Sequence, residues 1–415
     1  MKENFNIHKY LIALNNIEKV GDKRISALIN HYESIENIFE DTEKNIKEVL
    51  ENKFKYKIGN FNKNEVLEKA EKIIEKSKEH NIKILSLFDD EYPFNLKQID
   101  NPPYILYYKG DIKKLRRNAI AIVGTREPTS ESRKYAFDLA SKLSALNITV
   151  VSGMAKGIDK EAHLGAISSL VNTIAVLGSG IDKVYPAENL NIYNKLSENG
   201  LIISEYEVGK NPDKTNFPRR NRIIAGLSYA TIMVEASSRS GALITVDYAL
   251  NQGRDVYIAP YNEKMKEYYG NHKLYKDGAK IAHNILDILD DFDDIFSNDD
   301  EYVKMKFKYF EGGNIRKNNI KKSNDLLISN KNIKTNESIK IEKKNTKEIN
   351  KKENLNLNKD EEELYNIISK FEKIHIDDII EESKIKINTA TSILMQLEIN
   401  GIIKQTAGKY YSIEK

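Results

Sequence analysis

The chain has 415 residues, which by length alone suggests roughly two to four domains, and its 65 Lys and Arg residues nearly balance 62 Asp and Glu residues. The net charge therefore excludes neither a nucleic-acid nor a protein partner, and any surface that attracts a polyanion has to be local. The absence of Cys excludes disulfides and thiol chemistry, and the absence of a long apolar run or a signal peptide predicts a cytoplasmic protein without a membrane span.

The N-terminal segment, residues 1–75, is rich in Lys, Glu and Asn and carries apolar residues at helical spacing. Gly21-Asp22 interrupts that spacing and predicts the turn of a small helical domain of the helix-hairpin-helix or SAM-like type. The amides of such a turn can bind a DNA phosphate. A plain helical bundle, or a surface for a partner protein, is the alternative, because the usual hairpin turn has two glycines and only Gly21 is present here.

A larger domain is predicted over residues 81–295, with residues 81–116 as a connector. The connector contains the strand pattern ILSLF and a Pro102-Pro103 pair that extends the chain before a strand at Tyr104–Tyr108. Six apolar runs then alternate with helical patterns, at residues 119–123, 148–152, 173–177, 201–204, 230–234 and 255–259. Such strands form a parallel sheet that is buried on both faces. The expected fold class is α/β, an extended Rossmann-like, doubly wound and mostly parallel sheet.

Short turns rich in Gly and Ser follow four of these strands, and some carry a cation. Doubly wound sheets bind ligands at the carboxyl ends of their strands, where small residues let a ligand approach backbone amides. Parallel sheets need tight turns anyway, but four turns with matched cations favour a phosphate-binding rim. The candidate contacts in these turns are Gly124, Thr125, Arg126, Ser152, Gly153, Lys156, Gly157, Gly178, Ser179, Ser240 and Gly241.

Residues 217–228, FPRRNRIIAGLS, join a cationic start to an apolar continuation. Pro218 suits the first turn of a helix, and the pattern predicts a helix N-terminus that binds an anion. A solvated basic cap whose arginines pair with carboxylates is the alternative. Phe217 is assigned to base stacking, and Arg220 and Arg222 to phosphates. Arg219 and Asn221 complete the cluster, with no role assigned to Arg219.

The kind of phosphate follows from motifs that are missing. The first strand is not followed by G-x-G-x-x-G, and no P-loop pattern G-x-x-x-x-G-K-[ST] occurs. Nicotinamide and P-loop nucleotides are therefore disfavoured. Cations spread over separate turns suit the backbone of a single nucleic-acid strand.

The central domain resembles the DNA-processing protein A family, also called DprA or Smf. The resemblance covers about residues 84–289 and rests on the order and spacing of VGTR, SGMAKGID followed by Ala162-His163, TIAVLGSGID–VYP–EN, SEY, FPRRNRIIAGLS and VEASSRSGALITVDYALNQGRDVYIAP. It implies a homodimeric protein that binds and protects single-stranded DNA and loads the RecA recombinase during natural transformation and homologous recombination. It also implies a basic residue ahead of the aromatic, which is Lys214 here. The contacts that the resemblance favours first are Gly124, Arg126, Gly178, Ser179, Phe217, Arg220, Asn221 and Arg222.

Two positions depart from the family pattern. Tyr261 stands where the family usually has Gly, and Asn271-His272 stand where it usually has Thr-Asn.

The chemistry of an enzyme is not predicted. Rossmann-like phosphoribohydrolases carry a catalytic Glu in a PGGxGT-xxE signature, and Thr245 stands at that position here. His163 is interpreted as a structural residue that hydrogen-bonds to a turn, and Asp159 as an N-terminal helix residue stabilised by the helix dipole. Asp182 and Glu205 are interpreted as partners of nearby arginines. We therefore expect no catalytic residue, no metal and no cofactor. A nucleotide or nucleoside-phosphate hydrolase on the same sheet is the alternative function.

Residues 297–358 predict a disordered basic linker, since residues 312–356 hold 12 Lys and Arg against 5 Asp and Glu. Residues 359–415 predict a winged helix, with helices at Glu361–Phe371, Ile376–Ser383 and Ile387–Gly401 and a wing that turns at Ala407-Gly408. The third helix has few cations, unlike the helices that read duplex DNA. A protein-contact or regulatory role is therefore favoured over a winged-helix transcription regulator.

Overall fold

The computed structural model describes residues 2–54, 57–311 and parts of 359–413. The chain divides into two compact units, Met1–Gly313 and Asn314–Lys415, and each is described by itself. In the described ranges no helix is long and apolar enough to cross a membrane.

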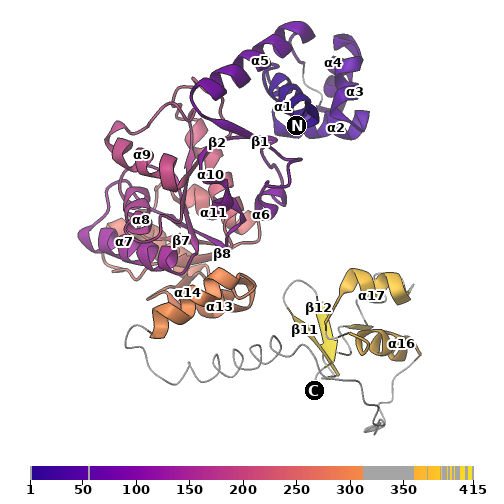
Figure 1. Ribbon diagram of the computed structural model, residues 1–415. Coiled ribbons are helices and arrows are strands. Elements are labelled where there is room, and N and C mark those ends of the chain that lie inside the picture. The colour runs from indigo at the N-terminus through magenta and orange to yellow at the C-terminus, as the bar shows by residue number, and fades with distance from the viewer. Residues whose placement is uncertain are drawn as a thin grey trace, which may run out of the picture. The chain divides into compact units, whose positions relative to one another are not determined.

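Five helices open the first unit: α1 Lys2–Asn15, α2 Asp22–Tyr32, α3 Ile35–Glu40, α4 Glu43–Phe54 and α5 Lys63–Glu79. The predicted turn at Gly21-Asp22 separates α1 from α2. Asn62 caps α5, because its side-chain oxygen accepts hydrogen bonds from the backbone N–H groups of Asn64 and Glu65. The helix continues past the predicted boundary at residue 75. Its apolar face joins the core of the adjacent strands, so the helices and the sheet form one unit (Figure 1).

The sheet of the first unit has nine described strands: β1 Lys83–Ser86, β2 Ile105–Gly110, β3 Ala119–Val123, β4 Thr149–Ser152, β5 Thr173–Leu177, β6 Leu201–Ser204, β7 Ala230–Met233, β8 Asp255–Ile258 and β9 Lys280–Ile281. Their order is β1-β2-β6-β5-β4-β3-β7-β8-β9. The seven strands from β6 to β9 are parallel, and β2 runs antiparallel to both of its neighbours. The six strands predicted in the central domain are all present, and the mostly parallel α/β fold is confirmed.

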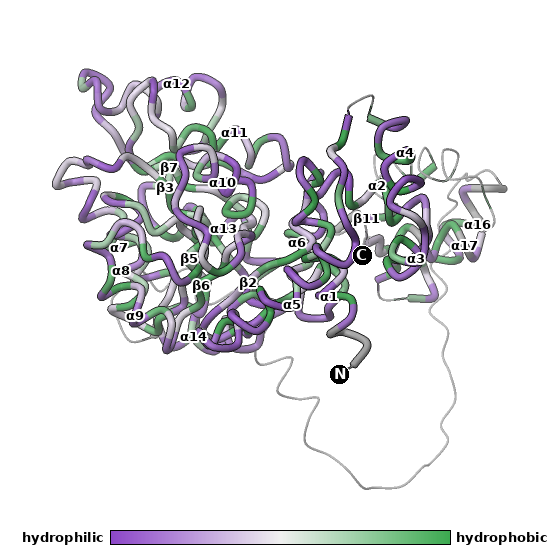
Figure 2. The backbone as a smooth tube through the Cα atoms, turned by 90° about the horizontal axis from the view of Figure 1, so that it is seen from above, coloured by the Kyte–Doolittle hydropathy of each residue, from purple (hydrophilic) through white to green (hydrophobic). Residues whose placement is uncertain are grey.

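Helices cover both faces of this sheet. They are α6 Phe94–Lys97, α7 Ser130–Ala145, α8 Ile158–Ile167, α9 Leu190–Asn199, α10 Asn216–Leu227, α11 Leu243–Asn251, α12 Tyr269–Lys276, α13 Leu286–Phe296 and α14 Asp300–Glu311, with 3-10 turns at Ile112–Arg116, Ala187–Asn189 and Lys266–Tyr268. Alternate residues of β3 belong to opposite apolar clusters: Ala119 and Ala121 pack with α10 and α11, whereas Ile120 and Ile122 pack with α7, α8 and α13. Figure 2 shows the apolar stretches following the strands inside these layers.

The start of the predicted linker is wrong. Residues Asp300–Glu311 form α14, which follows α13 directly. Tyr302 is fully buried beside Phe296, and its hydroxyl donates to Asp293. Burial of Tyr302 stabilises this helix, although most of the residues around it in the sequence are polar. Residues 312–358 of the predicted linker lie outside the described ranges.

The second unit contains the winged-helix elements. They are α16 Lys359–Ile368, β10 Ile374–His375, α17 Ile376–Ser383, β11 Ile403–Thr406 and β12 Tyr410–Ile413. The three strands form an antiparallel sheet in the order β10-β12-β11. The predicted second helix agrees with α17 in both bounds. Most of the predicted third helix, residues 387–401, and the wing turn at 407–408 lie outside the described ranges.

Candidate nucleic-acid interface

The loops at the carboxyl ends of β3, β4 and β7 are joined by backbone hydrogen bonds. Thr125, after β3, donates its N–H to the carbonyl of Glu235, after β7, at 2.8 Å. Its own carbonyl accepts from the N–H of Ile158, at the start of α8, at 3.1 Å. β3 and β7 are adjacent strands at which the winding of the sheet reverses, and ligands of doubly wound folds bind at this point. The loops after β3, β4 and β7 are therefore connected to one another, and we call the surface that they form the rim.

The deep anion sites of the rim are occupied by carboxylates of the protein. The buried Glu235 carboxylate accepts from the N–H and hydroxyl of Thr129, the N-cap of α7, at 2.9 and 2.7 Å. In the loop after β4, the buried Asp159 carboxylate accepts from the N–H groups of Gly153 and Ala155 at 3.1 and 3.3 Å. Helix N-termini and loop amides commonly bind phosphate. Here both are already neutralised, so a phosphate would have to bind further out.

Arg220 is a buried structural residue rather than a surface contact. Its guanidinium group donates to the carbonyls of Gly153, directly after β4, at 2.8 Å, and of Val176 in β5. Burial lowers the pKa of Arg220 to about 10, and the nearby Asp159 opposes that shift, so the group stays charged at neutral pH. A Cβ at Gly153 would lie 2.6 Å from this guanidinium group. Gly153 is small because it packs against Arg220.

Arg222 is also buried, and it joins α10 to the N-terminal helices. Its Nη2 atom lies 3.0 Å from the Asp22 carboxylate of α2 and 2.8 Å from the Glu205 carboxylate. The side chains of these three residues are at most 5% exposed. Arg219 approaches the same two carboxylates at 3.3 and 3.5 Å, but its side chain is 50% exposed. The expected pairing of Glu205 with an arginine is confirmed.

The assignment of Arg220 and Arg222 to phosphate contact is therefore corrected, because both guanidinium groups lie inside the protein with internal partners. Five predicted turn contacts are buried as well: Ser152, Gly153, Gly157, Gly178 and Ser179. The hydroxyl of Ser152 donates to the Ile122 carbonyl, and that of Ser179 to the Lys183 carbonyl. These small residues make room for packing rather than for a ligand.

Free cations remain on the outer surface of the rim. Arg126 and Lys214 are exposed, and their side chains form no hydrogen bond or ion pair with the described residues. The same holds for Arg239, beside the exposed Gly241 and the half-buried Ser240 in the loop after β7. Lys156 is exposed but paired with Glu188 at 2.6 Å. Arg239 escaped the sequence prediction, although, like Arg126, it is a cation within a small-residue turn.

Two aromatic rings stack on each other beside the turn that follows β5. Phe217, in the first turn of α10, packs over Gly178, where a Cβ would lie 2.7 Å from the ring. Its ring is stacked on Tyr185, with centroids 5.5 Å apart and planes 30° apart. Tyr185 is 48% exposed and was missed by the sequence prediction, although it lies within one of the strings that resemble the family. Nucleic-acid bases stack on such exposed rings.

The remaining predicted contacts are partly accessible. Gly124 and Thr125 are half-buried, and the Thr125 hydroxyl accepts from the N–H of Glu127 at 3.3 Å. Asn221 is half-buried, and its side-chain oxygen accepts from Nε of Arg220 at 3.2 Å. These residues shape the surface between the cations and leave Arg126, Lys214 and Arg239 as its free charges.

His163 lies in the interior, as its structural interpretation requires. It is fully buried on α8, and its Nδ1 atom lies 2.8 Å from the hydroxyl of Thr173. Burial lowers the pKa of His163 to about 3, and the charge of Arg220 acts in the same direction. The imidazole is therefore neutral at physiological pH and inaccessible to a substrate.

A pH dependence of stability follows for this histidine. The unfolded chain takes up a proton near pH 6.5 and the folded chain does not, so the stabilisation is complete above pH 6.5 and is lost as the pH falls towards 3. We expect the free energy of unfolding, relative to that of a His163→Gln variant, to fall by about 2 kcal/mol between pH 7 and pH 5. Urea titrations of both proteins measure this difference. A constant difference would contradict the buried neutral state.

The described residues contain no group of His, Asp or Glu side chains that could hold a metal ion. Thr245, at the position of the hydrolase's catalytic Glu, is buried in α11. Side-chain cations and aromatic rings dominate the accessible part of the rim. Cations bind phosphates and aromatic rings stack on bases, so this combination suits a nucleic-acid strand.

Comparison with known proteins assigns the chain to a family. The family model for DNA recombination-mediator protein A matches residues 83–293, and the model for the DprA winged helix domain matches residues 351–409. The chain belongs to the DNA recombination-mediator protein A family. The first match spans the whole sheet, and the second covers most of the described part of the second unit.

Relatives of known name agree with this assignment. Protein Smf of Synechocystis is 36% identical over 282 residues, 66% of this chain and 69% of the relative. DNA processing protein DprA of Streptococcus pneumoniae is 39% identical over 208 residues, 50% of this chain and 73% of the relative. The X-ray structure of DprA from Streptococcus pneumoniae is 32% identical, with a TM-score of 0.58 over 69% of this chain and 96% of that one.

The two departures from the family pattern contact each other. The hydroxyl of Tyr261 lies 3.1 Å from Nδ1 of His272. Asn271 is fully buried, where its side chain accepts from the N–H of Ala236 and donates to the carbonyl of Val234. Asn271 thus stabilises the loop after β7 from inside the protein, whereas the half-buried Tyr261 and His272 contact each other.

Proposed function

We propose that this chain binds single-stranded DNA along the rim, without catalysis, and acts as a mediator that protects the strand and loads a RecA-type recombinase. The observation that carries the proposal is the combination of Arg126, Lys214 and Arg239, which are exposed and unpaired among the described residues, with the stacked Tyr185–Phe217 pair, outside anion sites that the protein fills itself. Cations bind the strand's phosphates and the rings stack its bases. Membership of a family described as recombination mediators supports the choice of DNA.

The residues proposed to contact the strand are five accessible members of the predicted set together with two that the structure adds. They are Thr125, Arg126, Lys156, Lys214, Phe217, Tyr185 and Arg239. Transfer of the strand to the recombinase, a homodimer as the acting form and a cytoplasmic location complete the proposal. They rest on the family resemblance rather than on contacts within the chain.

Fluorescence anisotropy tests the proposal. A labelled oligonucleotide of about 20 nucleotides is titrated with the full chain at low salt, with unlabelled single strand and duplex of the same sequence as competitors. We expect the single strand to compete better than the duplex and the affinity to fall steeply with salt. Release of product from nucleoside monophosphates, without strand binding, would instead support the hydrolase.

Replacement of Tyr185 by Ala tests the stacking role. Stacking on an aromatic side chain contributes about 1–3 kcal/mol per base. We therefore expect about tenfold weaker binding of the single strand with an unchanged salt dependence, because no charge is lost. Leu190→Ala, which removes another exposed apolar side chain nearby in sequence, is the control. Equal affinities of the Tyr185→Ala variant and the original protein would show that bases stack elsewhere.

A further inference from the structure

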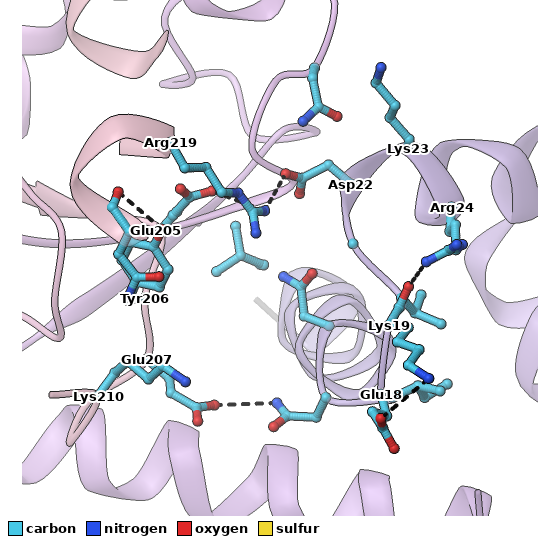
Figure 3. Close-up of a pocket in the computed structure, with 18 of the residues that line it drawn as sticks. Glu18, Lys19, Asp22, Lys23, Arg24, Glu205, Tyr206, Glu207, Lys210 and Arg219 are labelled. Carbon is cyan, nitrogen blue, oxygen red and sulfur yellow. Dashed lines mark hydrogen bonds and ion pairs between the residues drawn. The ribbon is translucent and has the colours of Figure 1, made fainter. Parts of the chain in front are cut away.

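We propose that the strand path extends from the rim into a second site, a groove between the N-terminal helices and the start of α10. The groove has a volume of about 730 Å³ and lies within the first unit. Its walls come from the turn between α1 and α2, from α5 and from the loop after β6 (Figure 3). This inference rests on the proposed function, because it assigns the groove to the same single strand.

The floor of the groove holds a network of buried charges that balance one another. Asp22 and Glu205 line the groove, and both pair with the buried Arg222. The half-exposed Arg219 approaches the same two carboxylates, and Figure 3 shows its contact with Asp22. Oε1 of Glu205 has no hydrogen-bond partner among the described residues, although only 5% of the side chain is exposed. The two carboxylates are therefore neutralised by two arginines and do not repel an anion strongly.

The edge of this groove carries exposed lysines. Lys23 on α2, Lys69 on α5 and Lys210 after β6 line it, and all three are exposed. Lys23 and Lys69 have no side-chain partner in the described part of the chain, whereas Lys210 interacts electrostatically with Asp213. Lys76 on α5 lies outside the groove lining but near Lys210 in the loop after β6, since its Nζ atom would lie 3.0 Å from a Cβ at the neighbouring Gly209. The acidic residues at the groove's edge are engaged: Glu207 with the Asn16 side chain, and Glu18 with Lys19.

The groove is continuous with the rim through the first turn of α10. Asn216 and Arg219 line the groove, while Phe217 between them stacks on Tyr185 at the rim. Lys214 precedes the same turn. A strand whose bases stack on the aromatic pair therefore has its next phosphates beside Lys210 and the lysines of the N-terminal helices. Lysines on separate walls, with no deep apolar pocket, suit a polyanion rather than a small ligand.

The test compares two strand lengths. In the variant Lys69→Glu/Lys210→Glu, affinity for a strand of about 30 nucleotides is expected to fall at least tenfold. Affinity for a strand of about 6 nucleotides, which the rim alone accommodates, is expected to fall less than threefold. The salt slope for the long strand should decrease by about one to two, because two phosphate contacts are lost. Both substituted lysines are exposed, so folding should be preserved, and the neutral variant Lys69→Gln/Lys210→Gln should give a smaller loss in the same direction.

The matched control is Lys142→Glu/Lys195→Glu, which changes the net charge equally with exposed lysines of α7 and α9. It should leave both affinities within threefold. Equal losses in the test and control variants would overturn the groove and leave the proposed function standing. If the wild-type protein binds neither strand, then both the groove proposal and the proposed function are wrong.

Discussion

Replacing Arg126 by Glu should weaken binding of single-stranded DNA by about tenfold to a hundredfold, or about 1.4–2.7 kcal/mol. Arg126 is exposed at the carboxyl end of β3, and its carbonyl packs against Gly157 at the start of α8. Burial lowers the pKa of the nearby Arg220, and the charge of Arg126 lowers it further, so the two guanidinium groups lie close to each other. Glu at this position removes a phosphate contact and adds a repulsive charge.

The salt dependence distinguishes this electrostatic role from a general disturbance. Loss of one phosphate contact lowers the slope of log affinity against log salt by about 0.7 for a single strand. We expect that reduction in the Arg126→Glu variant and an unchanged midpoint of thermal unfolding, because the side chain packs on the surface. Lys142→Glu, at the far end of α7, is the control and should bind normally. Wild-type affinity of the Arg126 variant would show that the strand does not pass the first turn.

Replacing Arg222 by Met should lower the free energy of unfolding by about 3–5 kcal/mol, because it leaves the Asp22 and Glu205 carboxylates buried without their main partner. Burial raises the pKa of Asp22, and the charge of Arg222 opposes that shift. The same guanidinium group donates from Nε to the Asn101 carbonyl in the connector. Its loss therefore detaches α2, the connector and α10 from one another.

The neutral variant Asp22→Asn/Glu205→Gln/Arg222→Met is the control for this second prediction. It removes the charge of all three partners, and we expect it to recover much of the lost stability, because no carboxylate remains unpaired in the interior. Urea unfolding of the three proteins measures these differences. If Arg222→Met unfolds normally but binds the strand poorly, then Arg222 contacts the strand and the structural role is wrong.

The sequence predicts the central strands well because each of the six is a short, mostly apolar run that ends at a turn of small or polar residues. Residues 119–123 and 201–204 are strands with those bounds. It predicts the rim as a region for a related reason, since small residues and cations gather after the strands. The local sequence pattern does not show which of these cations are buried.

Arg220 and Arg222 show the limit. In the string RRNR all three arginines are equivalent by composition, and burial of two of them depends on partners far away in sequence. Asp22 lies 200 residues from Arg222, and Gly153 lies 67 residues from Arg220. Likewise, the sequence does not show that carboxylates of the protein occupy the anion sites at the starts of α7 and α8. Only the folded structure brings Glu235 and Asp159 to them. Tyr185 becomes a candidate only through its stacking on Phe217.

Photochemical cross-linking tests the central claim most directly. A single strand that carries a photoreactive thymine analogue is irradiated with the full chain, and the linked peptides are identified by mass spectrometry. We expect cross-links at Tyr185 and Phe217, which compete away with unlabelled single strand, and their loss in the Arg126→Glu variant. Cross-links confined to the second unit, residues 314–415, would contradict the rim as the strand-binding surface.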